Sequence, residues 1–394
     1  MTSPDCLGAL ASQHELSAHL LESIPTDEAA HPYAPDLGCL SWWFAQGVWL
    51  ELYWLRERLL GDDRLTRPIR PLFHDRTAPA AGGCTALPPV DHLLKWARDI
   101  WDEHLLRLAN PGGLPRHPWL EGDRLPWFLA QQEALAYERM LMVLARRQHR
   151  RTGGFRVSRP LRARAPKVDA ATVVQGHFRV GALDDPAAYD NERPPQVVKL
   201  AVFRIARHPA THAEYLAFME DGGYQTPDYW DEAGRAWLRH REIRHPAHWR
   251  ADARGHWFGI SVNGPAELTP EDPVSGISRH EARAYAAWAA ARIPGLAGAV
   301  VQHEYQWEVA ARMGLIEDAG RVQEWCATPF HPYPEFSPWP DEDVSVPWFD
   351  HHGVLRGASL HGQRPIRRVT FRGHESPDWR YGFSGTRLVL PPDY

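Results

Sequence analysis

The sequence has few cysteines and no excess of positive charge. Its four cysteines, Cys6, Cys39, Cys84 and Cys326, lie far apart and form no C-x-x-C pair. We therefore expect no disulfide framework and a reducing, cytoplasmic setting. The 44 lysines and arginines against 49 aspartates and glutamates give a net charge of −5. Without a general positive field to hold a phosphate backbone, no nucleic-acid partner is expected.

Long hydrophobic runs are also missing. The most membrane-like stretch, residues 37–55, contains Ser41, Gln46 and Glu51. A carboxylate in the middle of a membrane span is costly, so the stretch predicts a buried bundle helix and no membrane partner. No basic stretch precedes an apolar one near the N-terminus, so no signal peptide is expected.

Several catalytic motifs are absent as well. The sequence has no G-x-G-x-x-G, P-loop, G-x-S-x-G or H-E-x-x-H pattern, which disfavours dinucleotide, nucleotide triphosphate, α/β-hydrolase and zinc-protease chemistry. What the chain does have is 394 residues, of which 44% are hydrophobic and 24% charged. This is the composition of a folded protein with two or three domains.

The first part of the chain has helical periodicity. Apolar residues recur three and four positions apart, and the breaks between these runs are rich in proline and glycine. The pattern predicts helices over 13–24, 38–60, 90–109 and 125–149, with a loop over 61–89. These lengths and connections suit an antiparallel four-helix bundle.

The second part has a different pattern. A basic, proline-punctuated segment around residues 146–167 marks the boundary, which we place between residues 155 and 156. Beyond it we expect an α+β domain stabilised by aromatic packing. Its expected strands and helices are Val197–Ile205, Gly353–Arg356, Arg387–Leu390, 211–220 and 279–292.

Ordered segments of this second part match one family. They are Tyr189–Glu192 (Y-D-N-E), Glu220–Tyr224 (E-D-G-G-Y), Ser278–Trp288, Gly320–Trp325, Leu355–Ser359 (L-R-G-A-S) and Phe383–Leu388 (F-S-G-T-R-L). In this order they resemble the formylglycine-generating-enzyme-type domain of ergothioneine sulfoxide synthases and their selenoneine-forming relatives. The resemblance implies a DinB-like four-helix bundle over 1–155 and an α+β formylglycine-generating-enzyme-like (C-type-lectin-like) domain over 156–394.

The resemblance also implies a cofactor that the residues do not support. In that family the bundle supplies three histidines to a non-haem iron, Fe(II). Alignment with the family's second and fourth helices puts Gln46, Gln132 and Ala136 at those three positions. An amide oxygen is a poor transition-metal ligand and alanine is none. We therefore predict that the standard iron triad is lost, and we assign no metal ligands.

The candidate site residues follow from this alignment. Near the lost triad they are Tyr137 and Glu138, as catalytic groups, and Gln46 and Gln132, as substrate-binding groups. In the second domain they are Glu375, where the family has a substrate-holding aspartate, with His374, Arg380 and Tyr333 on the substrate side. A surface ion pair is the alternative for Glu375, and packing is the alternative for Tyr333.

Three functions remain open. The first is a diverged member of the family, whose relatives form C–S or C–Se bonds on histidine-derived substrates. It would bind a small amino-acid-like or thiol/selenol substrate in the cleft between the domains. The second is a pseudoenzyme that binds a metabolite or a partner protein. The third is metal-free transfer or acid/base chemistry by Glu133, Glu138 or Tyr137. The sequence predicts no oligomeric state.

Overall fold

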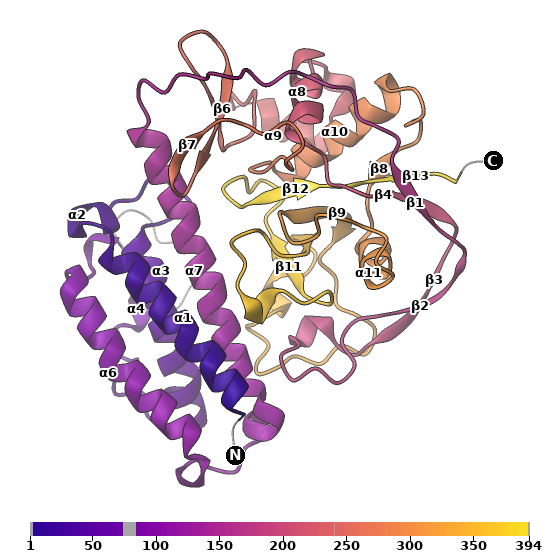
Figure 1. The fold of residues 1–394 in the computed structure, drawn as a ribbon. Helices are drawn as coiled ribbons and strands as arrows, with labels where there is room; N and C mark the ends of the chain where they lie inside the picture. Colours follow the sequence, from indigo (N-terminus) through magenta and orange to yellow (C-terminus); the bar gives the residue numbers. More distant parts are fainter. Residues whose placement is uncertain (1–2, 74–83, 240, 393–394) are drawn as a thin grey trace. The chain divides into compact units, whose positions relative to one another are not determined.

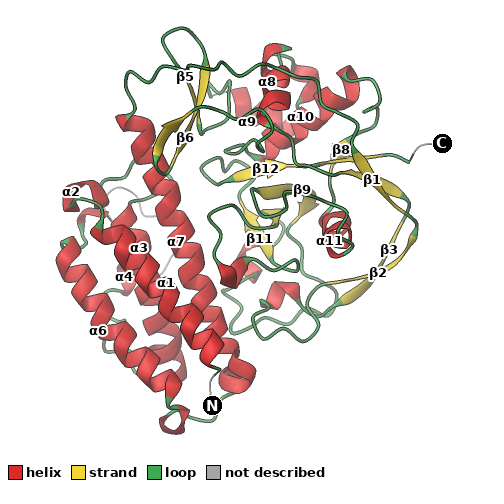
Figure 2. Cartoon of the chain, viewed as in Figure 1, coloured by secondary structure: helices red, strands yellow, loops and turns green. Residues whose placement is uncertain are grey.

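The computed structural model describes residues 3–73, 84–239 and 241–392. The chain divides into two compact units, residues 1–150 with 362–366 and residues 151–361 with 367–394 (Figure 1). The first unit is helical and the second contains both helices and strands (Figure 2). The predicted helical first part and mixed second part are therefore confirmed.

The four predicted helices of the first unit are all present. They are α1 (Pro4–Glu22), α3 (Leu40–Glu51) with its π-helical continuation η1 (Leu52–Leu59), α6 (Val90–Ala109) and α7 (Arg124–Arg151). Shorter elements are α2 (Thr26–Ala29), α4 (Arg70–Phe73), η2 (Pro111–Gly113) and η3 (Pro118–Asp123). Of the predicted loop 61–89, residues 74–83 lie outside the described part of the chain.

Helix α1 begins nine residues earlier than predicted because its start is well capped. The Ser3 hydroxyl accepts a hydrogen bond from the Asp5 amide, and Pro4 occupies the first helical position. A serine cap followed by proline satisfies a free amide and presets the backbone, so a helix can start there without an apolar stripe. The apolar pattern shows only where the helix is buried.

Aromatic and aliphatic side chains hold these helices together. Helix α1 packs against α3 and α6, and the Trp54 ring on η1 meets the ring of Phe128 on α7 edge-on at 5.5 Å. Trp42, Trp49 and Trp54 are among the largest fully buried side chains. Although these helices are apolar inside, none in the described residues is both long and apolar enough to cross a membrane.

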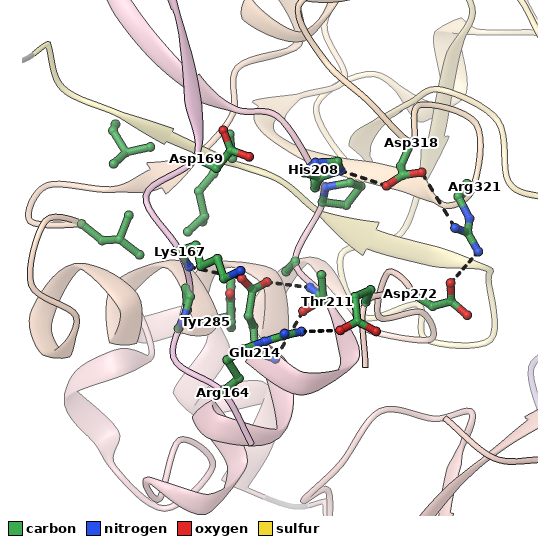
Figure 3. Close-up of a pocket in the computed structure, with 18 residues that line it drawn as sticks. Arg164, Lys167, Asp169, His208, Thr211, Glu214, Asp272, Tyr285, Asp318 and Arg321 are labelled. Atoms are coloured by element: carbon green, nitrogen blue, oxygen red, sulfur yellow. Dashed lines mark hydrogen bonds and ion pairs between the residues drawn. The ribbon is translucent and has the colours of Figure 1, made fainter. Parts of the chain in front are cut away.

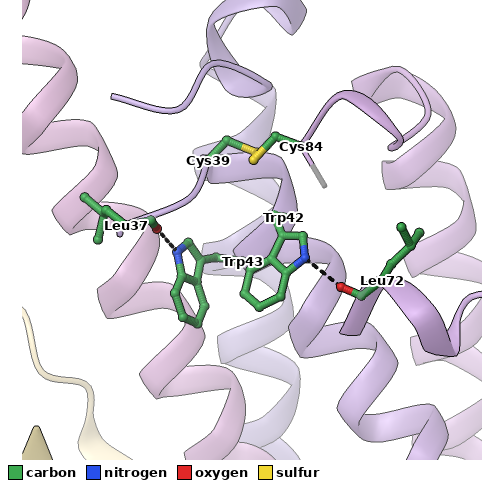
Figure 4. Close-up of a disulfide and its surroundings, with 6 residues drawn as sticks. All are labelled: Leu37, Cys39, Trp42, Trp43, Leu72 and Cys84. Carbon is green, nitrogen blue, oxygen red and sulfur yellow. Dashed lines mark hydrogen bonds between the residues drawn. A yellow bond between two sulfur atoms is a disulfide. The ribbon is translucent and has the colours of Figure 1, made fainter. Parts of the chain in front are cut away.

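One pair of cysteines corrects the expectation of unpaired thiols. Cys39, directly before α3, is joined by a disulfide to Cys84, with their Cα atoms 6.1 Å apart (Figure 4). Their separation of 45 positions in sequence gave no sign of this proximity, which arises because the chain returns to the start of α3. Cys6 and Cys326 are free and buried. The argument from cysteine usage for a reducing compartment therefore no longer holds.

The described residues of the second unit form four small sheets. Their strand orders are β1-β4-β13-β8, β11-β10-β9-β12, β2-β3 and β5-β6-β7. The strands are β1 (Ala170–Val173), β2 (Gly176–Val180), β3 (Gln196–Leu200), β4 (Phe203–Ala206), β5 (Trp249–Ala251), β6 (Trp257–Ser261), β7 (Gly264–Ala266), β8 (Val300–Val301), β9 (Gln323–Pro329), β10 (Gly353–Arg356), β11 (Arg372–Glu375), β12 (Ser384–Thr386) and β13 (Leu388–Leu390). The predicted segment Val197–Ile205 is two strands, β3 and β4, which belong to different sheets.

The helices of this unit surround an aromatic core. They are α8 (His212–Glu220), α9 (Glu232–Arg239), α10 (Arg279–Arg292) and α11 (Glu304–Arg312), with the short η4 (Asp190–Glu192), η5 (Pro227–Tyr229) and η6 (Val346–Trp348). The short helix η7 (Arg364–Ile366) belongs to the first unit. Capping boxes fix the starts of α8 and α10, since each cap pairs reciprocally with a glutamate three residues on. The core between α8 and α10 includes Tyr215, Phe218 and Trp288, as the predicted aromatic packing requires.

Three buried arginine–glutamate pairs tie the sheets to the rest of the unit. Arg387 donates to both oxygens of Glu324, at 2.8 and 2.9 Å. The other two pairs are Arg356 with Glu308 and Arg372 with Glu304. Breaking such a pair leaves an uncompensated charge in the core, so these contacts specify how the strands are placed.

Candidate functional site

A group of ionisable side chains lies inside the helical unit. Glu51 on α3 accepts one hydrogen bond at each carboxylate oxygen, from His14 Nε2 on α1 at 2.8 Å and from His104 Nδ1 on α6 at 2.7 Å. All three side chains are at least 95% buried. Burial alone would raise the pKa of Glu51, but the charge of His14 and the two hydrogen bonds lower it to about 2. The two histidines therefore hold Glu51 as a carboxylate.

Helix α7 adds a second carboxyl group to this cluster. One ligand atom each from His14, Glu51 and Glu133 lies within 4.8 Å of the other two. Glu133 is 2% exposed, and its Oε1 has no hydrogen-bond partner. Burial, and secondly the charge of Glu51, raise the pKa of Glu133 well above its usual range. The cluster thus contains one carboxyl group whose ionised form is stabilised, Glu51, and one whose ionised form is disfavoured, Glu133.

The sequence makes room for Glu133 with a glycine. A Cβ atom on Gly47 of α3 would lie 2.7 Å from Glu133 Oε2 and 2.9 Å from Oε1. Any side chain at this position would therefore collide with the carboxyl group. The missing side chain at Gly47 is what allows α7 to bring Glu133 against α3.

The residues at the three aligned triad positions do not fit an iron ion. Gln46 is 3% exposed and its Oε1 has no hydrogen-bond partner, while Ala136 is 6% exposed and has no ligand atom. Gln132 is half-buried. Two glutamine amides and an alanine offer no imidazole and at most two oxygen ligands, whereas a triad site needs three ligands.

The catalytic candidates on α7, Tyr137 and Glu138, lie near Glu133 in sequence. The cluster of possible metal ligands consists of His14, Glu51 and Glu133 and includes neither of them. Tyr137 is half-buried, and burial raises the pKa of its hydroxyl. Glu138 is 2% exposed. The side chains that the structure does bring together are those of His14, Glu51, His104 and Glu133.

In the second unit, two of the substrate-side candidates are connected through Phe330 and Arg372. The ring of His374, on β11, stacks on Phe330 at 4.2 Å, and its Nδ1 lies 3.0 Å from Nδ1 of His352. Arg372 lies over the rings of Phe330, at 5.0 Å, and Tyr333, at 4.2 Å. Tyr333 is 2% exposed, and its hydroxyl has no hydrogen-bond partner. His374 thus contacts Phe330 and Tyr333 contacts Arg372, which lies over both the Phe330 and the Tyr333 rings.

The other two candidates have partners within the unit. Glu375 ends β11 and accepts a hydrogen bond from the Ser376 amide at 3.3 Å. Arg380 binds both oxygens of the buried Glu281, at 2.8 and 2.9 Å. Burial would lower the pKa of Arg380, but the charge of Glu281 raises it. This guanidinium therefore neutralises the glutamate that caps α10.

The second unit also contains a pocket of about 350 Å³. Its charged lining residues include Arg164, Lys167, Glu214, Asp272, Asp318 and Arg321 (Figure 3). Its apolar lining includes the buried side chains of Tyr285, Leu296 and Leu388. Charges of both signs over an apolar lining are suited to a small molecule that carries both charges.

Sequence reasoning missed His14 and His104 as site residues. The available signal was their position, since each is an ionisable residue where the helical pattern calls for an apolar one. His14 lies one turn from Leu10 and Ala18, and His104 lies one turn from Ile100 and Leu108. A buried ionisable residue needs a partner from another element, and the sequence does not show which element that is.

Comparison with known proteins finds one domain match and several partly matching relatives. Residues 158–318 match the sulfatase-modifying factor enzyme 1-like domain. Hercynine oxygenase of Mycolicibacterium smegmatis is 34% identical over 277 residues, which cover 58% of this chain and 63% of that protein. The hercynine oxygenase of Mycolicibacterium thermoresistibile is 33% identical over 263 residues, covering 54% of this chain and 56% of its own.

A formylglycine-generating enzyme gives a shorter match. That of Thermomonospora curvata is 30% identical over 154 residues, covering 36% of this chain and 47% of that enzyme. The chain spans 56% to 63% of the length of the two hercynine oxygenases. Residues 158–318, within the second unit, thus match a domain of the formylglycine-generating-enzyme type, and part of the chain is homologous to part of the hercynine oxygenases.

Proposed function

We propose that the protein is a diverged relative of the hercynine oxygenases that binds a small amino-acid-like or thiol/selenol substrate. The homology to two hercynine oxygenases and the formylglycine-generating-enzyme-type domain support this family of activities. The name of these relatives indicates a substrate derived from histidine, which is a small zwitterion. The DinB-like character of the helical unit is part of the same proposal.

The observation that carries the proposal is the pocket of the second unit. A zwitterion needs a cation for its carboxylate, an anion for its ammonium and an apolar surface for the rest of the molecule. The exposed Lys167 supplies a cation for the carboxylate, and Glu214 and Asp272 supply anions on the same lining. The buried ring of Tyr285 is part of the apolar lining.

Several charged side chains of the lining are held in place by ion pairs and hydrogen bonds within the pocket, so the positions of the charges are defined before a ligand binds. Arg321 binds Asp272 at 2.7 Å, and His208 Nδ1 lies 3.0 Å from Asp318. Glu214 accepts hydrogen bonds from the backbone amides of Thr211 and Lys167. A ligand would meet oriented groups, and the cost of ordering them on binding would be small.

Titration calorimetry of the full chain tests this proposal. The ligands are histidine, hercynine, cysteine and selenocysteine, and each is compared with an uncharged isostere. We expect the zwitterions to bind and Lys167→Ala to weaken binding about tenfold, the loss of one charged hydrogen bond. Lys199→Ala, an exposed lysine on β3 that does not line the pocket, is the matched control. No heat from any zwitterion, or equal binding by both variants, would overturn the proposal.

A second candidate function is a non-catalytic binding protein, and the buried Gln46 and Ala136 favour it. If these residues replace iron ligands, the chain binds its metabolite without oxidising it. Oxygen consumption with Fe(II), a zwitterion and a thiol distinguishes the two candidates. Uptake of oxygen that depends on the zwitterion supports the oxidative enzyme, and binding without uptake supports the binding protein.

A further inference from the structure

The cluster in the helical unit places two buried carboxyl groups close together, next to the imidazole of His14. Glu51 and Glu133 are 1% and 2% exposed, and their oxygen atoms lie within 4.8 Å of each other and of a nitrogen of His14. Two buried carboxylates at this distance repel each other strongly. The arrangement is stable only with a proton or a positive ion between them.

The two carboxyl groups differ in how they are held. Glu51 has one histidine on each oxygen, at 2.8 and 2.7 Å. Glu133 has no such support, because its Oε1 lies in the core without a hydrogen-bond partner. A native core leaves few polar atoms unpaired, and each one needs an explanation. Here the carboxyl group with the unpaired oxygen lies beside a carboxylate and an imidazole, which are metal ligands.

We propose that His14, Glu51 and Glu133 bind one divalent transition-metal ion inside the helical unit. His104 would hold Glu51 in place through its second oxygen and would not itself be a ligand. This is the usual arrangement around metal sites, where a hydrogen bond from outside orients each coordinating group. The site does not depend on the zwitterion pocket, and its ligands are not the aligned triad positions 46, 132 and 136.

The ligand set indicates which ions fit. One imidazole and two carboxylates suit Zn²⁺, Co²⁺, Fe²⁺ or Mn²⁺, whereas copper(I) and iron–sulfur clusters prefer thiolates. Atoms about 2.1 Å from one metal lie roughly 3–3.5 Å apart, so ligand atoms within 4.8 Å need only small side-chain rotations. The three ligands come from α1, α3 and α7, and the ion would therefore link three helices of the bundle.

Two features of α3 lie next to each other in sequence near this cluster. A side chain at Gly47 would collide with the Glu133 carboxyl group, so the glycine keeps this group where the other ligands can meet it. Gln46 has a buried amide oxygen without a partner. Gly47 and Glu51 lie four residues apart on α3 and therefore share one face of the helix, the face that Glu133 approaches.

Cobalt(II) titration of the tag-free, metal-stripped full chain tests the proposal. Co²⁺ is followed by its visible absorption and by elemental analysis after dialysis. We expect one equivalent of tightly bound ion and weak visible bands, without the intense near-ultraviolet band of cobalt thiolates. Zn²⁺ should compete for the site, and Mg²⁺ should not.

Substitutions then locate the ion. Glu133→Gln and His14→Gln should weaken Co²⁺ binding by more than about tenfold, and His104→Gln by about 10–100-fold. Glu103→Gln is the matched control, because Glu103 precedes His104 on α6 but binds Arg107 at 2.7 Å outside the cluster. Far-ultraviolet circular dichroism checks that each variant folds. Absence of stoichiometric binding, or unchanged affinity in folded Glu133→Gln, would overturn the proposal and leave a shared proton as the explanation.

Discussion

His104 Nδ1 lies 2.7 Å from Glu51 Oε1, in a part of the helical unit where these side chains are 0% and 1% exposed. The second oxygen of Glu51 is bound just as closely by His14. One carboxylate therefore satisfies a polar atom from each of two other helices. The consequences can be measured even before any metal is added.

Replacement of Glu51 should destabilise the helical unit strongly. Glu51→Ala removes the shared acceptor and leaves two buried imidazoles unpaired, which should cost about 3–5 kcal/mol. Urea unfolding followed by circular dichroism measures this. Glu22→Ala, whose exposed partner is Arg98, should cost about 1 kcal/mol or less. Equal losses in the two variants would mean that Glu51 does not organise the core.

The same comparison should depend on pH. The pKa of Glu51 is lowered to about 2 in the folded protein, below its usual value of 4.5, so its ionised form stabilises the fold. This contribution is complete above about pH 4.5 and disappears as the pH falls toward 2. The stability difference between the natural protein and Glu51→Ala should therefore shrink below pH 4.5.

Glu133 should have the opposite pH dependence in the metal-free protein. Burial and the charge of Glu51 raise its pKa in the folded state, so ionisation favours the unfolded chain above about pH 4.5. Glu133→Gln removes this penalty. We expect its melting temperature to exceed that of the natural protein by a margin that grows between pH 5 and pH 8. A margin independent of pH would show that Glu133 is not the titrating group.

Two glycines in helices should respond differently to alanine. Gly8 on α1 has open space around its Cα, so Gly8→Ala should stabilise the helix by about 0.5–1 kcal/mol. Gly47→Ala places a Cβ atom 2.7 Å from the Glu133 carboxyl group. This substitution should therefore give no stabilisation, or should lower the free energy of unfolding by about 1–3 kcal/mol through overpacking. Chemical denaturation of both variants measures the contrast. A similar gain at both positions would contradict the close approach of Glu133 to α3.

The disulfide predicts a thiol count and a stability effect. Titration of the denatured, unreduced protein with a thiol reagent should find two free thiols, those of Cys6 and Cys326. Replacing both Cys39 and Cys84 by serine should cost up to about 4 kcal/mol, because the bond closes a long loop in the unfolded chain. Four free thiols would restore the argument for a reducing compartment. A cytoplasmic location stays a prediction.

Local patterns allowed much of the fold to be predicted from the sequence. The apolar periodicity of α6 and α7 marks both helices within two residues of their ends, because each has one buried face along its whole length. The short strands of the second unit were harder to predict. β5 and β7 have three residues each, too few for an alternating pattern to stand out.

The candidate site could be predicted only in part. Glu133 was recognised as a possible acid or base, but its partners His14 and Glu51 come from helices far away in the sequence. Cys39 and Cys84 show the same limit. Periodicity identifies the buried face of a helix, whereas the residue that meets it depends on the packing of all the helices together.

The pocket lining has one further consequence, which concerns labelling. The whole chain has three lysines, Lys95, Lys167 and Lys199, and Lys167 alone among them lines the pocket. Amine-acylating reagents would therefore modify very few side chains. A molecule seated in the pocket would shield one of them, so a peptide map of acylation would report occupancy without any knowledge of the reaction.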